Sequence, residues 1–232
     1  MQIQGNEGSK SNIQCFFLLR EEVTLVIILT MKEILERSIR KRSFLLMLLL
    51  LPLIWIIIEL LFDSIQANPL QELLISTGET AVWLLVGLLW ISPLRRAFPR
   101  SQILRALQSQ KRVLGLGVFS YVLFHFLIYL VDRADLHEIV EDLFRVFLLS
   151  GLAAFSILLL LALTSSNRKI RQFGAKRWKI LHRAVYVSAG MILLHMLLKE
   201  KSDPLQALLL FLPLAGAEIL RLILWLRNRS IA

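Results

Sequence analysis

The most regular feature of the chain is a series of long apolar stretches separated by short polar segments. Each stretch is continuously apolar and lacks the alternation of a half-buried strand; the six are residues 43–62, 73–94, 113–131, 143–163, 184–198 and 205–226. A helix needs about 20 residues to cross the roughly 30 Å hydrocarbon core of a bilayer, and most of the stretches approach that length. The pattern predicts an all-α membrane protein, a bundle of six transmembrane helices in a lipid bilayer, and argues against a transmembrane barrel.

The last two stretches are less regular than the others. The fifth is short, so it spans a bilayer only if the preceding turn, residues 178–183, continues the same helix. The sixth contains Pro213 and places Glu218 and Arg221 three residues apart, a spacing at which two side chains of a helix can pair. We expect a helix in both places, with an ion pair near the end of the sixth.

Composition indicates that these helices lie in a membrane, and the distribution of charge predicts their orientation. The chain has 232 residues and is 56% hydrophobic, which is too apolar for a water-soluble core of this size. Basic residues gather before residue 43, between 95 and 112, between 168 and 183 and at the C-terminal end, and acidic connections alternate with them. The positive-inside rule then predicts that both termini are cytoplasmic. The net charge of +10 reflects this topology, so we expect no nucleic-acid partner.

The charge pattern also divides the chain into three segments. We expect a cytoplasmic N-terminal extension over residues 1–42, the membrane bundle over residues 43–226 and a short cytoplasmic tail over residues 227–232. The apolar run at residues 23–31 is too short to span and lacks the order of a signal peptide. Because Met31 directly precedes the basic segment and the first span, translation from Met31 is an alternative to translation from Met1.

Three of the four histidines lie in or at the ends of apolar stretches, where an imidazole is costly and is a functional-site hypothesis by default. At 1.5 Å per residue, His125 lies about 20 Å and His195 about 24 Å from the cytoplasmic edge, on helices that run in the same direction. Two imidazoles at similar depth are the bis-histidine arrangement of an electron-carrying haem. The single Cys15 permits no covalent attachment motif, so the expected group is haem b. The alternative is a hydrogen-bonded pair of helices without a cofactor.

The third histidine, His182, lies about 20 Å below His195 at the inner end of the same helix. Thirteen residues of regular helix turn the two side chains about 140° apart, unless the helix is distorted near Gly190. No histidine partner is evident, because His137 lies in an acidic outer loop. A second haem at His182 would need a water, another residue or an open position as its other ligand. An interfacial histidine bonded to backbone or lipid is the alternative.

Other side chains suit a haem pocket. Tyr121 lies one helical turn before His125 and gives that face a polar aromatic character. Arg112 and Arg177, at the cytoplasmic edge, could pair with haem propionates, although membrane topology explains them equally well.

Several short motifs follow one another in a fixed order: 77–81 (TGETA), 92–95 (SPLR), 111–116 (KRVLGL) leading to His125 and Tyr129, 161–165 (LALTS), 176–178 (KRW), 181–186 with His182 and Tyr186, and His195. In order and spacing they resemble the MsrQ (YedZ) family, and the resemblance covers roughly residues 45–225. Two departures are Met196, where the family often has an aromatic residue, and the N-terminal extension.

The resemblance implies a ferric-reductase-like transmembrane bundle in the bacterial inner membrane that binds one or two haem b groups through His125, His182 and His195. It implies an electron-transfer subunit rather than a catalytic one, fed by the quinone pool or a cytosolic flavin reductase. The acceptor would be a periplasmic molybdopterin enzyme, MsrP-like, that reduces methionine sulfoxide in proteins. FMN binding is implied by the resemblance alone.

Two further functions compete with electron transfer to a partner enzyme. The sequence has no GxGxxG or phosphate-cradling loop, so we expect that the protein does not take hydride from a nucleotide itself. A haem reductase that acts directly on external ferric or cupric chelates is the first alternative. A haem-free scaffold or small transporter is the second.

Overall fold

The computed structural model describes residues 30–62, 68–133, 137, 140, 144–199 and 204–229, and within these ranges the chain is helical. The principal helices are α2 (Arg42–Phe62), α3 (Pro69–Ala97), α4 (Gln102–Arg133), α6 (Val146–Leu163), α7 (Asn167–Phe173), α8 (Ala175–Leu181), η1 (His182–Ala184), α9 (Val185–Leu198) and α10 (Pro204–Arg229). The prediction of an all-α protein is confirmed for these residues. The apolar run at residues 23–31 lies almost wholly outside the described residues.

Five helices are long and apolar enough to cross a membrane: Pro69–Ala97, Gln102–Arg133, Val146–Leu163, Ala175–Leu198 and Pro204–Ile223. A sixth span is formed if Thr30–Arg40 and Arg42–Ile58, which meet at an angle of 91°, count as one bent element. The predicted continuation of the fifth span through residues 178–183 is confirmed. α10 reaches Arg229, so it extends into the segment predicted as a tail.

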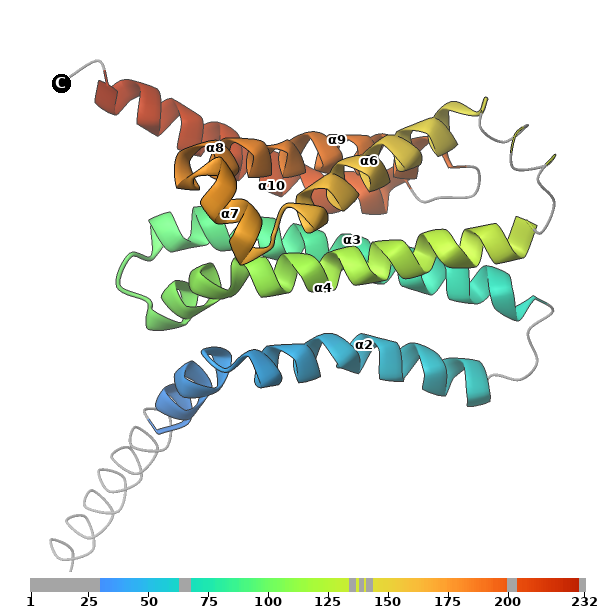
Figure 1. Ribbon diagram of the computed structural model, residues 1–232, viewed down its shortest axis with the longest axis horizontal. Coiled ribbons are helices and arrows are strands. Elements are labelled where there is room, and N and C mark those ends of the chain that lie inside the picture. Colours follow the sequence, from blue (N-terminus) through green and yellow to red (C-terminus); the bar gives the residue numbers. More distant parts are fainter. Residues whose placement is uncertain are drawn as a thin grey trace, which may run out of the picture.

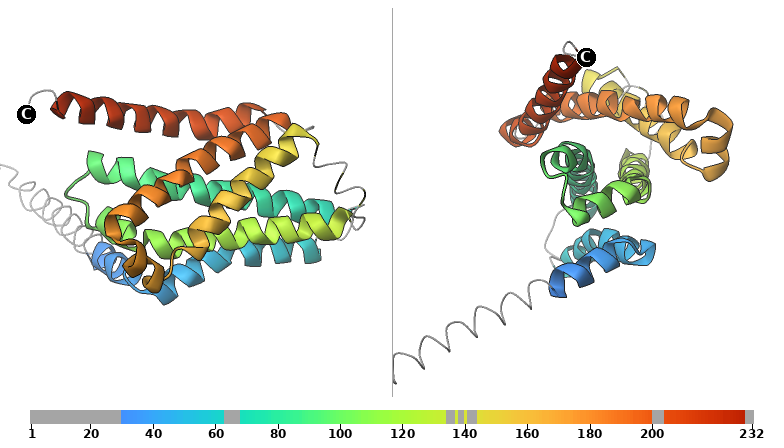
Figure 2. Two further views of the ribbon diagram at one scale, coloured as in Figure 1. Left: turned by 45° about the horizontal axis from the view of Figure 1, so that its top comes forward. Right: turned by 90° about the vertical axis from the view of Figure 1, so that its left-hand side faces the viewer.

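The helices form layers, with α3 and α4 in the middle, α2 on one side and α6, α9 and α10 on the other (Figures 1 and 2). Two close pairs, α3 with α4 and α6 with α9, make up most of the packing. Small residues let α6 and α9 approach, because Ser188 is fully buried and its hydroxyl donates to the Ala154 carbonyl at 3.4 Å. Large apolar side chains such as Trp55, Phe124 and Leu209 remain exposed, as lipid-facing residues do.

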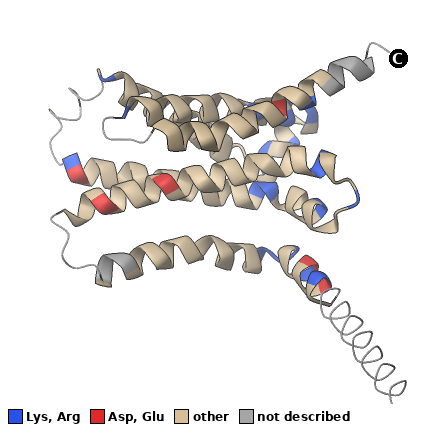
Figure 3. Ribbon diagram, turned by 180° about the vertical axis from the view of Figure 1, so that it is seen from behind, with Lys and Arg blue, Asp and Glu red and all other residues tan. Residues whose placement is uncertain are grey.

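One end of the bundle carries most of the Lys and Arg residues (Figure 3). α2 begins and α10 ends there, and α7 and α8 lie there too (Figure 1). We call this the basic end and the other the opposite end. The connection predicted over residues 95–112 is mostly helical, since α3 continues to Ala97 and α4 begins at Gln102. Burial explains the difference, because Ala106 packs with Ile39, which precedes the apolar stretches, and with Leu45 near the start of the first one.

α2 is joined to α4 by the hydroxyl of Tyr121. Pro52 interrupts α2, since proline has no N–H and its ring crowds the preceding turn. The Tyr121 hydroxyl accepts from the Leu53 N–H at 3.0 Å and donates to the Leu49 carbonyl at 2.6 Å. These are the two groups that bond directly in a regular helix, so the tyrosine is inserted into the hydrogen-bond ladder of α2 beside the proline.

Replacing Tyr121 by phenylalanine should therefore loosen α2 from the bundle. Leu49 and Leu53 would lose the partner that bridges them, at a cost of about 1–3 kcal/mol for unsatisfied buried groups. The expected result is a lower midpoint of thermal unfolding in detergent and faster proteolysis within α2. Ser120→Ala is the control, because the exposed Ser120 hydroxyl only bonds within its own helix. Equal thermal midpoints for the two variants would contradict this role.

Candidate functional site

His125 is on α4, in the half of that helix nearer the opposite end of the bundle. Its ring lies against α3. Its Nδ1 is 2.9 Å from the Leu74 carbonyl oxygen on α3. The ring rests on Gly78, where an added Cβ would meet His125 Cε1 at 2.8 Å and Nδ1 at 2.9 Å. The imidazole is therefore in direct contact with the backbone of the neighbouring helix.

His195 on α9 has the same surroundings on α6. Its Nδ1 is 2.7 Å from the Phe147 carbonyl oxygen. The ring rests on Gly151, where an added Cβ would meet His195 Nδ1 at 2.7 Å and Cε1 at 3.0 Å. In both cases the glycine lies four residues after the residue whose carbonyl the histidine contacts.

These contacts settle which ring nitrogen is available to a metal. A carbonyl oxygen only accepts, so Nδ1 carries the proton and donates, and Nε2 is left with its lone pair. This is the outer-shell arrangement that orients histidine ligands in metal sites. The two imidazoles lie within electrostatic range of each other, and Lys199 lies within range of both. The structure thus brings together the two histidines that the sequence paired.

The ligand set suits a porphyrin better than a bare ion. Within the described ranges no group of three or more His, Cys, Asp or Glu side chains could hold a metal ion. A macrocycle supplies four ligands of its own and asks the protein for only one or two axial ones. Phe126, next to His125, stacks on Phe155 with ring centroids 4.4 Å apart, which gives the site an apolar wall between α4 and α6.

His182 lies at the basic end, where α8 passes into η1. Its ring packs against Trp178 with centroids 3.9 Å apart, and the Trp178 indole donates to the Thr164 carbonyl at 3.0 Å. His182 Nε2 is buried without a hydrogen-bond partner among the described residues. An orphaned buried nitrogen of this kind fits a ligand position, because burying a polar atom unpaired costs free energy.

The helix between His182 and His195 is distorted at residues 182–184, and α9 is continuous past Gly190, where a distortion would have changed the angle between the two side chains. A 3₁₀ turn winds 120° per residue instead of 100°, so three residues add roughly 60°. The angle between the two histidines falls from about 140° to about 80°. The two side chains therefore still differ in direction around the helix axis.

The remaining candidates have other contacts. The Tyr121 hydroxyl is committed to α2, the Arg112 guanidinium donates to the Asn167 side chain, and Arg177 is exposed. Contacts of Tyr121, Arg112 and Arg177 with a cofactor stay predictions. His137 is exposed and helical, and its place on the outer side stays a prediction.

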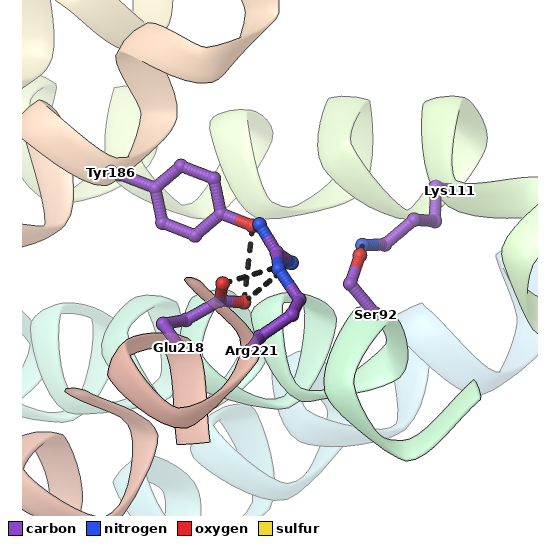
Figure 4. A network of polar contacts seen from close by, with 5 residues as sticks. All are labelled: Ser92, Lys111, Tyr186, Glu218 and Arg221. Atoms are coloured by element: carbon purple, nitrogen blue, oxygen red, sulfur yellow. Dashed lines mark hydrogen bonds and ion pairs between the residues drawn. The ribbon is translucent and has the colours of Figure 1, made fainter. Parts of the chain in front are cut away.

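A network of polar side chains joins four helices toward the basic end (Figure 4). The predicted pair is confirmed, since Arg221 and Glu218 on α10 are 2.8 Å apart. The Tyr186 hydroxyl on α9 donates to Glu218 at 3.2 Å, and Lys111 on α4 donates to the Ser92 hydroxyl on α3 at 2.7 Å. Lys111 interacts electrostatically with both charges of α10. The sequence showed only the spacing of the pair and could not show which helices face it.

Comparison with known proteins adds to this geometry. Residues 78–194 match the family model described as ferric reductase like transmembrane component, a range that includes His125 and His182 and ends one residue before His195. The fold and this match define a ferric-reductase-like transmembrane protein. No solved structure matches the chain.

Comparison with curated proteins indicates to which family within this class the chain belongs. The chain is 39% identical over 152 residues to the protein-methionine-sulfoxide reductase heme-binding subunit MsrQ of Ralstonia nicotianae, covering 64% of this chain and 68% of the relative. It is 35% identical over 181 residues to MsrQ of Rhodospirillum rubrum, covering 77% and 82%. A stretch of 103 residues is 39% identical to the magnetosome protein MamZ of Magnetospirillum gryphiswaldense, covering 43% and 16%. The chain belongs to the MsrQ family.

Proposed function

We propose that the protein is the haem-binding membrane subunit that carries electrons in a protein-methionine-sulfoxide reductase system. One observation carries the proposal: Nδ1 of His125 and Nδ1 of His195 each bond to a backbone carbonyl, which leaves each Nε2 with its lone pair, and the two rings lie within electrostatic range of each other. The curated relatives are named as heme-binding subunits of such a system.

His125 and His195 would be the axial ligands of one haem b, and His182 would be a ligand of a second. The bound iron would accept and release single electrons, at a potential set by its ligands and by the dryness of the pocket. The carbonyls of Leu74 and Phe147 hold the two imidazoles in one tautomer, and Lys199 lies close enough to both to balance propionate charge at the opposite end. Arg112 and Arg177 retain their predicted place as propionate partners near His182.

The orientation of the bundle follows from the positive-inside rule. The basic end faces the cytoplasm of a bacterial inner membrane, with both termini on that side, and the outer pair of histidines lies toward the periplasm. Electrons enter near His182 from the quinone pool or a cytosolic flavin reductase and leave near His125 and His195 to a periplasmic, MsrP-like molybdopterin enzyme. FMN remains a prediction from the family resemblance.

An absorption spectrum tests the proposal directly. Protein purified from haem-sufficient cells should give a b-type α-band after dithionite reduction, and its absence would favour the haem-free scaffold or transporter. The reduced protein should then be reoxidised on adding the periplasmic partner with methionine sulfoxide. Reoxidation by ferric or cupric chelates, with none by the partner enzyme, would instead support the external metal reductase.

A further inference from the structure

We propose that Gly78 and Gly151 are positioning residues that set how the two imidazoles approach iron. Each belongs to a hydroxyl–glycine pair, Thr77–Gly78 on α3 and Ser150–Gly151 on α6. The inference rests on the proposed haem-binding function and identifies the part of the backbone on which that function depends.

The two pairs are built alike although they lie on different helices. Taking the residue whose carbonyl accepts from the histidine as the first position, the hydroxyl is three residues later and the glycine four. The Thr77 hydroxyl donates to Leu74 O at 3.1 Å, and to Leu73 O at 2.7 Å. The Ser150 hydroxyl donates to Phe147 O at 2.7 Å. The same carbonyl thus receives a histidine and a hydroxyl in both places.

Helix geometry explains why the glycine must lie four residues after the carbonyl. In an α-helix the carbonyl of one residue points at the N–H four residues later. A ring that reaches such a carbonyl from a neighbouring helix therefore lies over the α-carbon of that later residue. Carbon atoms that are not bonded approach to about 3.5–4.0 Å. A Cβ at Gly78 or Gly151 would come within 2.7–3.0 Å of ring atoms, so only glycine leaves room for the imidazole.

The hydroxyls of Thr77 and Ser150 influence the direction in which the two carbonyls point. Thr77 is fully buried and Ser150 is 5% exposed, so neither hydroxyl has water as an alternative partner. A side-chain hydroxyl bonded to a carbonyl of the preceding turn bends a helix slightly. We infer that this tilt turns each carbonyl toward the facing helix, where Nδ1 meets it.

Most other glycines of the described helices do not crowd a side chain in this way. A Cβ at Gly87, Gly190 or Gly216 would have no atom within 4 Å, and one at Gly115 would make an ordinary contact. Gly117 is crowded, but by the flexible Leu49 side chain of α2. Among these helical glycines, contact with a ring is confined to the two that support the paired histidines.

The test is substitution of Gly78 by alanine, and separately of Gly151, in the full-length protein. Haem per polypeptide, the midpoint potential and the low-spin electron paramagnetic resonance spectrum are measured. Disturbing the partner of a metal-ligating histidine weakens metal binding about 10–100-fold, so we expect haem at this site to be lost to that extent. Where haem remains, a tenfold difference between the weakening of ferric and ferrous binding shifts the potential by about 59 mV.

Gly87→Ala is the matched control. Gly87 is on α3, exposed, and about 180° around the helix from Gly78, so its methyl group meets nothing. It should leave haem content, potential and spectrum unchanged. If Gly78→Ala and Gly151→Ala also leave all three unchanged while the wild type holds haem, the inference is overturned and the proposed function stands. Wild-type protein without haem would overturn both.

A double variant covers the case in which Gly78→Ala does not accumulate in the membrane. Removing the imidazole in His125→Ala frees the space that the new methyl group needs. His125→Ala with Gly78→Ala should then accumulate as well as His125→Ala alone. If the double variant is also absent, Gly78 serves helix packing and the positioning role is wrong.

Discussion

His125→Ala and His195→Ala are each expected to abolish the same haem. The two imidazoles lie on different helices but share their electrostatic surroundings and the same type of support. If they clamp one iron, removing either ligand leaves that iron with a single axial partner and a cavity in place of the other. Haem content should fall to the same level in both variants, and the double variant should lose no more than either one alone.

Haem per polypeptide, measured on protein purified in equal amounts, checks this expectation. His137→Ala is the control, since His137 is exposed. Full haem content in either single variant would show that the two histidines do not share a haem. Losses that add in the double variant would indicate two separate haems and would require a different partner for each histidine.

His182→Ala is expected to have a different effect, on electron entry. His182 Nε2 is buried without a partner among the described residues, and the ring is fixed against Trp178. If it ligates a second haem, the alanine variant loses that haem and keeps the one between His125 and His195, because sites this far apart act independently. Reduction of the remaining haem by the physiological donor should slow by at least the roughly 10–100-fold that disturbing an outer-shell partner costs a metal site.

Two measurements separate this from a general loss of structure. Dithionite, which needs no entry site, should still reduce the remaining haem fully in the His182→Ala protein. The spectrum of that haem should match the wild type. A variant that keeps all of its haem and its normal rate with the donor would make His182 an interfacial residue, the alternative that its position near a helix end also allows.

The helices were predictable because most of the apolar stretches approach the length of a span and are flanked by charged residues. The same local reasoning predicted the pairing of Glu218 with Arg221, since three residues along a helix bring two side chains together whatever surrounds them. Local reasoning failed at residues 182–184, where the helix tightens to a 3₁₀ turn, because nothing in the composition of that segment breaks a helix. The helical extension of α4 to Gln102 was also missed, since it depends on packing against residues near Ile39.

For the site, the sequence supplied the histidines and their depth, because depth follows from counting residues along a helix. It did not indicate the roles of Gly78 and Gly151, since a glycine in an apolar helix has several uses and only the facing side chain distinguishes them. It also gave no sign that the Tyr121 hydroxyl bridges Leu49 and Leu53 in the hydrogen-bond ladder of α2. Each of these contacts joins residues more than forty positions apart.

The sequence by itself determined that this is a helical membrane protein with three histidines in or at the ends of its apolar stretches, because hydrophobicity and helical rise are properties of each segment alone. Only the tertiary structure decided which helix faces each histidine, and therefore that Leu74 and Phe147 hold Nδ1 and leave Nε2 available. The physical reason is that lipid surrounds every span equally, so apolar patterning carries little information about neighbours, and close packing over small residues selects them.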